Sequence, residues 1–148
     1  MSEERVKRKL SAILIADVVG YSRLMQEDEV STIRNLEDSK KLMSEFIEQY
    51  KGRVVDAVGD NLLAEFNSVV DATECAVKIQ EDLNTRNAEL PEDKRMEFRI
   101  GINLGDVIVD GERIYGDGVN VAARMEALAE AGGICVSGSA YEQIENKL

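Results

Sequence analysis

The stretch LSAILIAD, residues 10–17, decides the fold that this sequence predicts. It is an almost purely apolar run that ends on an aspartate, and a small, flexible VVGY turn follows it. A short apolar run bounded by a turn is typical of a strand buried inside a sheet. We therefore expect a central strand here, with the carboxylate of Asp17 at its carboxyl end.

The segments after this strand predict further helices and strands. Between residues 27 and 50 the apolar side chains recur at steps of three and four, which indicates an amphipathic helix. The strand-like runs 53–58 and 62–66 flank a turn that contains Asp60, which is typical of a hairpin. The later elements that we expect are a helix capped by Asn67 or Ser68, strands at 98–104 and 107–109 about Gly105 and Asp106, a helix at about 118–129, a strand at 134–136 and a helix from Ser139 onward.

This order of elements predicts an α+β fold, a sandwich with a largely antiparallel sheet and helices packed on one face. If the helix after Asp17 makes a right-handed crossover, the second strand of the hairpin lies antiparallel beside the first strand. That arrangement brings Asp17 and Asp60 together at one end of the sheet. With 148 residues, 44% of them apolar, the chain is expected to form a single domain, 1–148, with one core.

The composition excludes several classes of function. The net charge of -11 argues against a nucleic-acid partner and against contact with an anionic membrane, because both need a clustered basic surface. Histidine is absent from the whole sequence, which excludes mechanisms that use an imidazole base. Proton transfer is therefore left to carboxylates, metal-bound groups or the substrate.

Cysteine usage and hydropathy indicate the compartment. Cys75 and Cys135 each lie in an apolar segment without metal-ligand spacing, which predicts buried reduced thiols rather than a disulfide or a zinc site. No apolar run approaches the roughly 20 residues that cross a bilayer, and the N-terminus lacks the apolar stretch of a secretion signal. The expectation is an intracellular, cytoplasmic domain.

Asp17 and Asp60 form the first candidate site. Two carboxylates that converge at the end of a sheet offer the oxygen ligands that Mg²⁺ or Mn²⁺ prefers. The backbone N–H groups of residues 18–21 would face the same space and could bind phosphate oxygens. The alternative is that Asp17 merely ends a strand and Asp60 is an ordinary turn residue. A carboxylate that abuts an apolar run is costly unless it is paired or metal-bound, which gives Asp17 more weight than Asp60.

Four segments carry a resemblance to a known family. They are IADVVGYSRLM at 15–25, VVDAVGDNLLAEF at 54–66, FRIGINLGDVIV at 98–109 and IYGDGVNVAARME at 114–126. In this order they resemble the successive signature segments of class III adenylate/guanylate cyclase catalytic domains, over nearly the whole chain. The resemblance implies the ferredoxin-like form of the sandwich. It also implies a nucleotidyl cyclase that converts ATP or GTP into a 3′,5′-cyclic nucleotide and pyrophosphate, in second-messenger signalling.

The resemblance also assigns metal and phosphate binding to individual residues. Two divalent ions per site, Mg²⁺ or Mn²⁺, would be held by Asp17, Asp60 and the backbone carbonyl of Val18. One ion would lower the pKa of the ribose 3′-hydroxyl that attacks the α-phosphorus, and the other would neutralise the departing pyrophosphate. Phosphate binding would fall to Val19, Gly20 and Tyr21.

Asn120 and Arg124 are the catalytic residues that the resemblance implies. They are four residues apart on one expected helix and therefore share a face. Arg124 would stabilise charge on the α-phosphoryl group, and Asn120 would orient the ribose. Family members work as head-to-tail dimers in which one protomer supplies the metal aspartates and the other supplies base recognition, the asparagine and the arginine. A homodimer would therefore have two sites, each shared between the chains in this way. Apart from the motif, Arg124 would be a surface cation beside Glu126 or Asp117.

Two positions depart from the family pattern. Adenylate cyclases typically recognise the base with a lysine and with an aspartate or threonine, and these positions are Asp56 and Arg113 here. Guanylate cyclases carry an acidic residue at the first position, so Asp56 leans towards GTP. Arg113 matches neither pattern, and the choice between ATP and GTP stays open. The alternative is that Asp56 is an exposed strand residue that reads no base.

The sequence also ends before the strand or hairpin that the family usually adds after the last helix, where a lysine grips the triphosphate. The expected domain would therefore have an exposed sheet edge and lack one cationic phosphate contact. Two functions compete. The first is a working cyclase, which the intact metal and catalytic positions favour. The second is a catalytically degenerate cyclase domain that acts as a nucleotide-binding or dimerising regulatory module, which the altered base positions and the absent segment favour.

Overall fold

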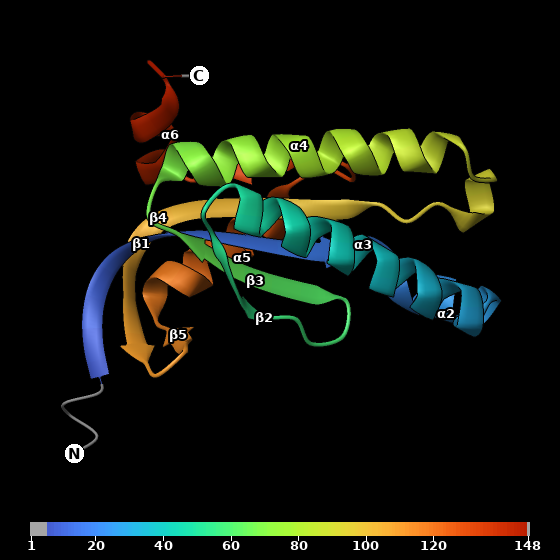
Figure 1. Cartoon of the computed structure of the whole chain (residues 1–148), viewed down its shortest axis with the longest axis horizontal. Coiled ribbons are helices and arrows are strands. Elements are labelled where there is room, and N and C mark those ends of the chain that lie inside the picture. The colour runs from blue at the N-terminus through green and yellow to red at the C-terminus, as the bar shows by residue number, and fades with distance from the viewer. Residues whose placement is uncertain (1–5, 148) are drawn as a thin grey trace.

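The computed structural model describes residues 6–147, in which a curled six-stranded sheet carries helices on both faces (Figure 1). The strand order is β2-β3-β1-β4-β5, and β6 pairs with β4 off this path. The pairing of β6 with β4 is parallel and the others are antiparallel. The strands are β1 (Val6–Val18), β2 (Arg53–Asp56), β3 (Asn61–Phe66), β4 (Phe98–Asp110), β5 (Arg113–Tyr115) and β6 (Ile134–Val136).

Two of the longer helices begin at side-chain caps. The Asp28 side chain accepts a hydrogen bond from the Ser31 N–H group at the start of α3, and Ser68, rather than Asn67, caps α4 in the same way. The helix expected over 27–50 is α3, and the extended backbone of Asp28 separates it from α2, a further helix that was not expected. The helices are α2 (Tyr21–Glu27), α3 (Glu29–Gln49), α4 (Val69–Ala88), a 3₁₀ turn (Glu92–Lys94), α5 (Asp117–Leu128) and α6 (Gly138–Ile144).

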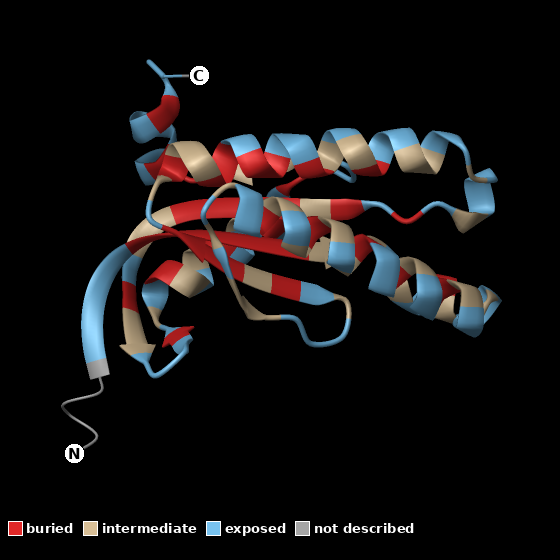
Figure 2. Ribbon diagram, viewed as in Figure 1, coloured by how far each residue is buried: buried red, intermediate tan, exposed pale blue. Residues whose placement is uncertain are grey.

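Alternate residues of β1 pack on opposite faces of the sheet. Ala12, Leu14 and Ala16 lie in the larger core, together with residues of α3, α4 and α6. Ile13 and Ile15 lie in a smaller core with residues of α5. Figure 2 shows buried residues along the middle of the sheet and on the helix surfaces that face it. Both faces of β1 are therefore buried over residues 11–16, as the apolar sequence predicts, whereas residues 7–10 are exposed.

The predicted α+β sandwich with a largely antiparallel sheet is confirmed, with one difference in the placement of helices. They are not confined to one face, because α5 packs on the face opposite α3 and α4 (Figure 1). Gly101 of β4 permits this packing, since a Cβ at that position would collide with the α5 backbone at Ala122 and Glu126. The missing side chain lets α5 lie directly against the sheet.

β4 is one long strand, whereas two strands were expected on either side of Gly105 and Asp106. Gly105 lies inside the strand, where a Cβ would come within 3.2 Å of the Gly118 Cα at the start of α5. This glycine therefore serves a close approach between two elements rather than a turn. The turn of the hairpin comes later, between β4 and β5.

The strand register places Asp17 near the end of the sheet, on the face that α5 covers. Its neighbours across the two ladders are Asn61 of β3 and Arg99 of β4. Because alternate residues of a strand share a face, Asp17 points to the same side as Ile13 and Ile15. A carboxylate is thereby brought to the border between the smaller core and solvent.

Within residues 6–147, none of the helices combines the length and apolarity that crossing a bilayer requires. Both cysteines are free thiols, as predicted. Cys75 is buried as expected, whereas Cys135 is only half-buried. Burial raises the pKa of the Cys75 thiol to about 12. This thiol therefore stays protonated at neutral pH and acts as a core residue.

Candidate active site

The carboxyl groups of Asp17 and Asp60 meet at the end of the sheet. Asp17 is the penultimate residue of β1, and Asp60 lies in the turn that leads into β3. The antiparallel register pairs Asp17 with Asn61, so the residue before Asn61 stands beside the end of β1. The Asp60 carboxyl group is within hydrogen-bonding range of the Asp17 carboxyl group. The predicted proximity of the two aspartates is therefore present in the fold.

The surroundings of Asp17 disfavour its negative charge. Burial, the hydrogen bond to Asp60 and the charges of Asp60 and Glu126 raise the pKa of Asp17 to about 7, against a smaller opposing effect of the Val18 backbone N–H group. Two carboxylates this close cannot both be ionised without a compensating cation. A divalent cation between them would remove that repulsion, and carboxylate oxygens are ligands that Mg²⁺ and Mn²⁺ prefer.

The two aspartates do not form a complete set of metal ligands. Among residues 6–147, no three cysteine, aspartate or glutamate side chains are arranged to hold a metal ion by themselves. Further ligands would have to be backbone oxygens, substrate oxygens or water, which is the usual arrangement for Mg²⁺ bound together with a polyphosphate. The chemistry of the pair thus fits a cation that arrives with its substrate.

Glu126 is a third acid near the pair, and the sequence analysis did not assign it to the site. Glu126 is only 8% exposed and lies on the surface of α5 that faces the sheet. Burial raises the pKa of Glu126, the charge of Arg99 opposes this, and the charge of Asp60 adds to it. A signal for Glu126 was present, because it continues the three- and four-residue steps of Val119 and Ala122 and thus places an acid on the buried stripe of the helix.

The loop after β1 contains the residues that were expected to bind phosphate. The Val19 N–H group donates a 2.8 Å hydrogen bond to the Glu97 carbonyl. That group is committed to the protein, so the expectation that the Val19 backbone binds phosphate is corrected. Gly20 follows with a φ of 65°, a conformation that favours glycine, and Tyr21 begins α2. Val18 pairs with Phe98 at the end of the β1–β4 ladder.

Asn120 and Arg124 lie on the outer surface of α5, away from the aspartates of their own chain. Both residues are exposed, and an Arg124 Nη2 atom lies 3.8 Å from an Asp117 carboxylate oxygen. At about 100° of helical rotation per residue, Arg124 and Glu126 point in nearly opposite directions. Within one chain, the structure therefore brings Glu126 to Asp17 and leaves Asn120 and Arg124 exposed on the far side of the helix.

Asp56 and Arg113, the expected base-recognition residues, contact each other. The Arg113 guanidinium donates a 3.0 Å hydrogen bond to the Asp56 carboxylate. Asp56 lies in β2 and Arg113 in β5, the strands at the two ends of the sheet order. The sheet is curled far enough that its two edges approach each other.

A groove of about 390 Å³ lies beside these residues. Its polar lining includes Asp56 of this contact, and Asn61 and Glu126, which neighbour the aspartates. Apolar side chains of β1, β3 and α5, among them Ile15 and Val119, complete the lining. The groove has the mixed lining of a ligand site, apolar walls with a few polar groups.

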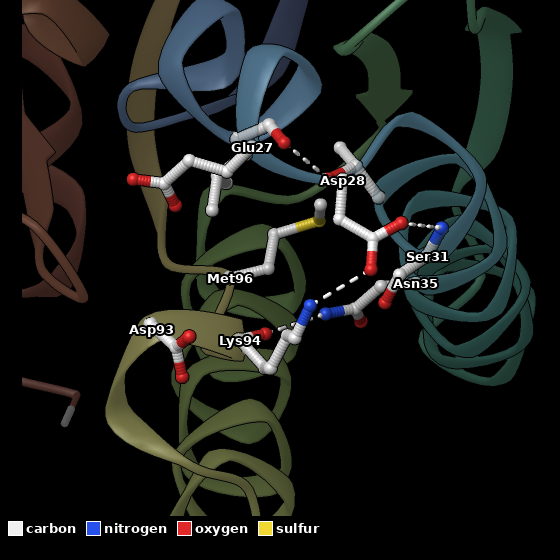
Figure 3. Close-up of a pocket in the computed structure, with 9 residues that line it drawn as sticks. Glu27, Asp28, Ser31, Asn35, Asp93, Lys94 and Met96 are labelled. Carbon is white, nitrogen blue, oxygen red and sulfur yellow. Dashed lines mark hydrogen bonds and ion pairs between the residues drawn. The ribbon is translucent and has the colours of Figure 1, made fainter.

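A second cavity, of about 190 Å³, lies among α2, α3 and the segment before β4 (Figure 3). Lys94 and Asp28 form a 2.8 Å ion pair in it, and the Asn35 side chain donates to the Lys94 carbonyl at 3.2 Å. The ion pair lowers the pKa of Asp28 and raises that of Lys94. These contacts fasten the ends of α2 and α3 to the 3₁₀ turn and leave the aspartate pair as the better candidate site.

Comparison with known proteins identifies the family. Residues 5–148 match the model of the adenylate and guanylate cyclase catalytic domain. The chain is 45% identical over 148 residues to a putative adenylate cyclase 3 of Rhizobium meliloti (strain 1021), a match that covers 99% of this chain and 25% of that protein. An adenylate cyclase of Streptomyces coelicolor is 28% identical, over 96% of this chain and 36% of its own. The chain thus spans only a quarter to about a third of these relatives.

Solved structures share the fold. A crystal structure of an adenylate/guanylate cyclase/hydrolase from Silicibacter pomeroyi has a TM-score of 0.90 and 39% identity, covering 97% of this chain and 84% of that one. The adenylyl cyclase CyaB from P. aeruginosa has a TM-score of 0.84 at 24% identity, covering 96% and 83%, a likeness of fold alone. The resemblance of the four segments is confirmed: the chain belongs to the class III adenylate and guanylate cyclase catalytic domain family.

Proposed function

We propose that this domain converts ATP or GTP into a 3′,5′-cyclic nucleotide and pyrophosphate, with Asp17 and Asp60 as its metal-binding carboxylates. The observation that carries the proposal is the contact between these two carboxyl groups beside a groove. Two bound Mg²⁺ or Mn²⁺ ions would activate the ribose 3′-hydroxyl and neutralise the departing pyrophosphate. The Val18 carbonyl is the proposed third ligand from the chain.

The loop between β1 and α2 is the proposed binding site for the phosphates. The N–H groups of Gly20 and Tyr21 precede the first complete turn of α2, where N–H groups lack partners within the helix. They lie three and four residues after Asp17 in the loop that follows β1, so a triphosphate held by cations at Asp17 would lie near them. Val19 is left out of this set because its N–H group already donates to Glu97.

The catalytic asparagine and arginine are proposed to act on the nucleotide bound by a second copy of the chain. Support comes from α5, whose outer surface carries Asn120 and Arg124 while its inner surface carries Glu126. In a head-to-tail homodimer, Arg124 would stabilise charge on the α-phosphoryl group of the neighbouring site, and Asn120 would hold the ribose in line for attack. Each dimer would then contain two sites.

Asp56 and Arg113 are proposed to recognise the purine base as a pair. The carboxylate accepts hydrogen bonds and the guanidinium donates them, and the two groups already lie 3.0 Å apart. A purine edge presents donors and acceptors side by side, so a mixed pair is complementary to either ATP or GTP. Second-messenger signalling in the cytoplasm is the proposed setting of the domain and of any longer protein that contains it.

The test is incubation of the purified chain with ATP or GTP and Mn²⁺, followed by chromatography for the cyclic product. Asp60→Ala should abolish the product, because the remaining carboxylate cannot hold the cations alone. Asp93→Ala, which removes an exposed aspartate far from the pair in the cavity of Figure 3, should leave it unchanged. Nucleotide binding without product from the unmodified chain would replace the proposal with a regulatory, nucleotide-binding function.

A further inference from the structure

The two edge strands of the curled sheet are joined through two arginine side chains. Arg113 of β5 donates to the Asp56 carboxylate of β2 at 3.0 Å. Arg53 of β2 donates from Nη1 to the backbone carbonyl of Glu112 at 2.9 Å. Glu112 and Arg113 are consecutive, so the second contact fixes the backbone immediately beside the residue that makes the first.

A buried glutamate fixes the guanidinium of Arg53. The Nε and Nη2 atoms of Arg53 donate to one carboxylate oxygen of Glu65, at 3.1 and 2.6 Å. The other oxygen accepts a 3.0 Å hydrogen bond from the Ser11 hydroxyl and lies 3.4 Å from the Lys9 ammonium group. Glu65 is 7% exposed. Its carboxylate is thus held from β1 while it holds Arg53 of β2.

Glu65 is charged in this setting despite its burial. Burial favours the neutral form, but the hydrogen bonds from Arg53 and Ser11, with the nearby charges of Lys9 and Arg53, hold the pKa of Glu65 below its ordinary value. A buried carboxylate that orients an arginine in this way provides a rigid anchor, because the guanidinium fork has a fixed geometry. The remaining nitrogen of the guanidinium, Nη1, donates to the Glu112 carbonyl.

The backbone of β2 does not place Asp56 by itself. The β2–β3 ladder pairs Arg53 with Glu65 in regular register, but the register shifts between Val54 and Asp56. An irregular ladder holds its strand less firmly than a continuous one. Arg113 is placed by the pairing of β5 with β4, and the side-chain contacts at the two ends of β2 join Asp56 to it across the gap between the edge strands.

We propose that Arg53, held by Glu65, is a positioning residue for base recognition: it clamps the Glu112 backbone against β2 and so aligns Arg113 with Asp56. The inference rests on the proposed function of Asp56 and Arg113. Arg53 itself does not touch the base. Loss of Arg53 changes the relative orientation of Asp56 and Arg113, which lowers the affinity for the base. The metal-dependent chemistry at Asp17 and Asp60 continues.

Arg53→Lys is the decisive variant. A lysine keeps the charge beside Glu65, so the domain folds, but a single ammonium group cannot also reproduce the fork that reaches the Glu112 carbonyl. Arg53→Met removes both contacts. Arg86→Met is the matched control, because Arg86 also joins two elements, α4 and α3, through bonds of 3.1 Å to Ser39 and 3.4 Å to Asp38, on the other side of the sheet.

The activity readout is the ratio of kcat/KM for ATP to kcat/KM for GTP. In Arg53→Lys the ratio should move towards one by roughly fivefold, the effect of one lost hydrogen bond, and through KM rather than kcat. Arg86→Met should keep the ratio of the unmodified domain even if it lowers the melting temperature. An unchanged ratio in Arg53→Lys would overturn the inference.

A second readout separates this inference from the proposed function. Binding of 3′-deoxy-ATP and 3′-deoxy-GTP with Mn²⁺ needs no turnover, and failure to bind either analogue or to form product is a failure of the proposed function. The clamp is then judged by the Nη–H resonance of Arg113 in a ¹⁵N-labelled chain, because Nη2 donates to Asp56. Asp56→Asn should displace this resonance in the unmodified background and leave it in place in the Arg53→Lys background; equal displacement in both would overturn the clamp.

Discussion

The carboxyl group of Asp17, at the end of β1, lies within hydrogen-bonding range of that of Asp60, in the turn before β3. Burial and this contact raise the pKa of Asp17 to about 7. Without metal, the folded domain therefore keeps a proton on the pair at pH values where the unfolded chain has lost it. A bound divalent cation would replace that proton, which makes the pair sensitive to pH and to metal together.

We expect the metal-free domain to lose stability as the pH rises. The pKa of Asp17 is about 7 in the folded domain and 3.8 without these surroundings. Between these values the folded state binds more protons than the unfolded state, so the free energy of unfolding falls with rising pH and levels off above about pH 7. Thermal unfolding in EDTA from pH 4 to pH 8 measures this contribution.

Mn²⁺ should raise the melting temperature in the upper part of that range, where the cation no longer competes with the proton. The gain should grow with free metal as RT ln(1 + [L]/Kd), about 2.7 kcal/mol at 100 times Kd. Asp60→Asn should weaken both the pH slope and the metal effect, whereas Asp93→Asn should alter neither. A melting temperature indifferent to Mn²⁺ at pH 8 would argue against a metal site at the aspartate pair.

Two inactive variants should restore each other if the sites are shared between chains. Asp17→Ala and Arg124→Ala should each abolish product formation alone, because every site in each homodimer lacks one essential group. In an equal mixture about half of the dimers are mixed and one of their two sites is intact, so about a quarter of the unmodified activity should return. The measurement is product formation after mixing and re-equilibration; no return of activity would mean that one chain supplies the whole site.

Arg124→Lys should lower kcat by about 10²–10³ with little change in KM, because the planar guanidinium is proposed to bind charge that develops in the transition state. Arg23→Lys is the control, since Arg23 is another exposed helical arginine, in an ion pair of 3.3 Å with Glu27. Steady-state kinetics with Mn²⁺ compares the two. Equal effects would assign Arg124 to the surface ion pair with Asp117 instead.

Reversal of the Asp56–Arg113 pair should change the base that the domain prefers. Asp56→Lys combined with Arg113→Asp keeps an ion pair across the two strands but reproduces the pattern typical of adenylate cyclases, so the ratio of kcat/KM values should shift towards ATP. Asp56→Lys alone replaces the carboxylate that pairs with Arg113 by a second cation and should impair both substrates. A ratio that the double variant leaves untouched would remove these residues from base recognition.

Gly101→Ala should destabilise the domain by about 1–3 kcal/mol, because a methyl group there collides with the α5 backbone at Glu126. Gly138→Ala is the matched control: a Cβ there meets no atom within 4 Å, and alanine favours the helix that begins at this residue. Chemical denaturation of both variants gives the comparison. Equal stability would mean that α5 does not depend on close approach to β4.

The meeting of Asp17 and Asp60 was predictable because local patterns determine it. An apolar run predicts β1, a glycine turn predicts the β2–β3 hairpin, and a right-handed crossover decides which strands pair. The position of α5 was not predictable in this way. It depends on Gly101, whose missing side chain acts on a helix that comes much later in the chain, and such contacts leave no periodic signal.

The residues of the site also divide into those that local patterns predict and those that depend on long-range contacts. Asp56 and Arg113 were assigned as a pair by resemblance, but the contact between them arises from the curl of the sheet, which depends on the sum of strand twists rather than on any short segment. The commitment of the Val19 N–H group to Glu97 is likewise a long-range backbone contact. Glu126 is different. Its place in the apolar stripe of α5 can be recognised from the sequence, although the sequence did not lead to its assignment to the site.

The two surfaces of α5 have a mechanical consequence. Glu126 faces the aspartates of its own chain, and Arg124, two residues earlier, faces outward, where the proposed dimer places the neighbour's nucleotide. A helix of 12 residues moves as a stiff rod, so a rotation that relieves crowding at one active centre swings the arginine at the other. In such a dimer the two active sites cannot adjust independently, and nucleotide binding at one site would strain the other.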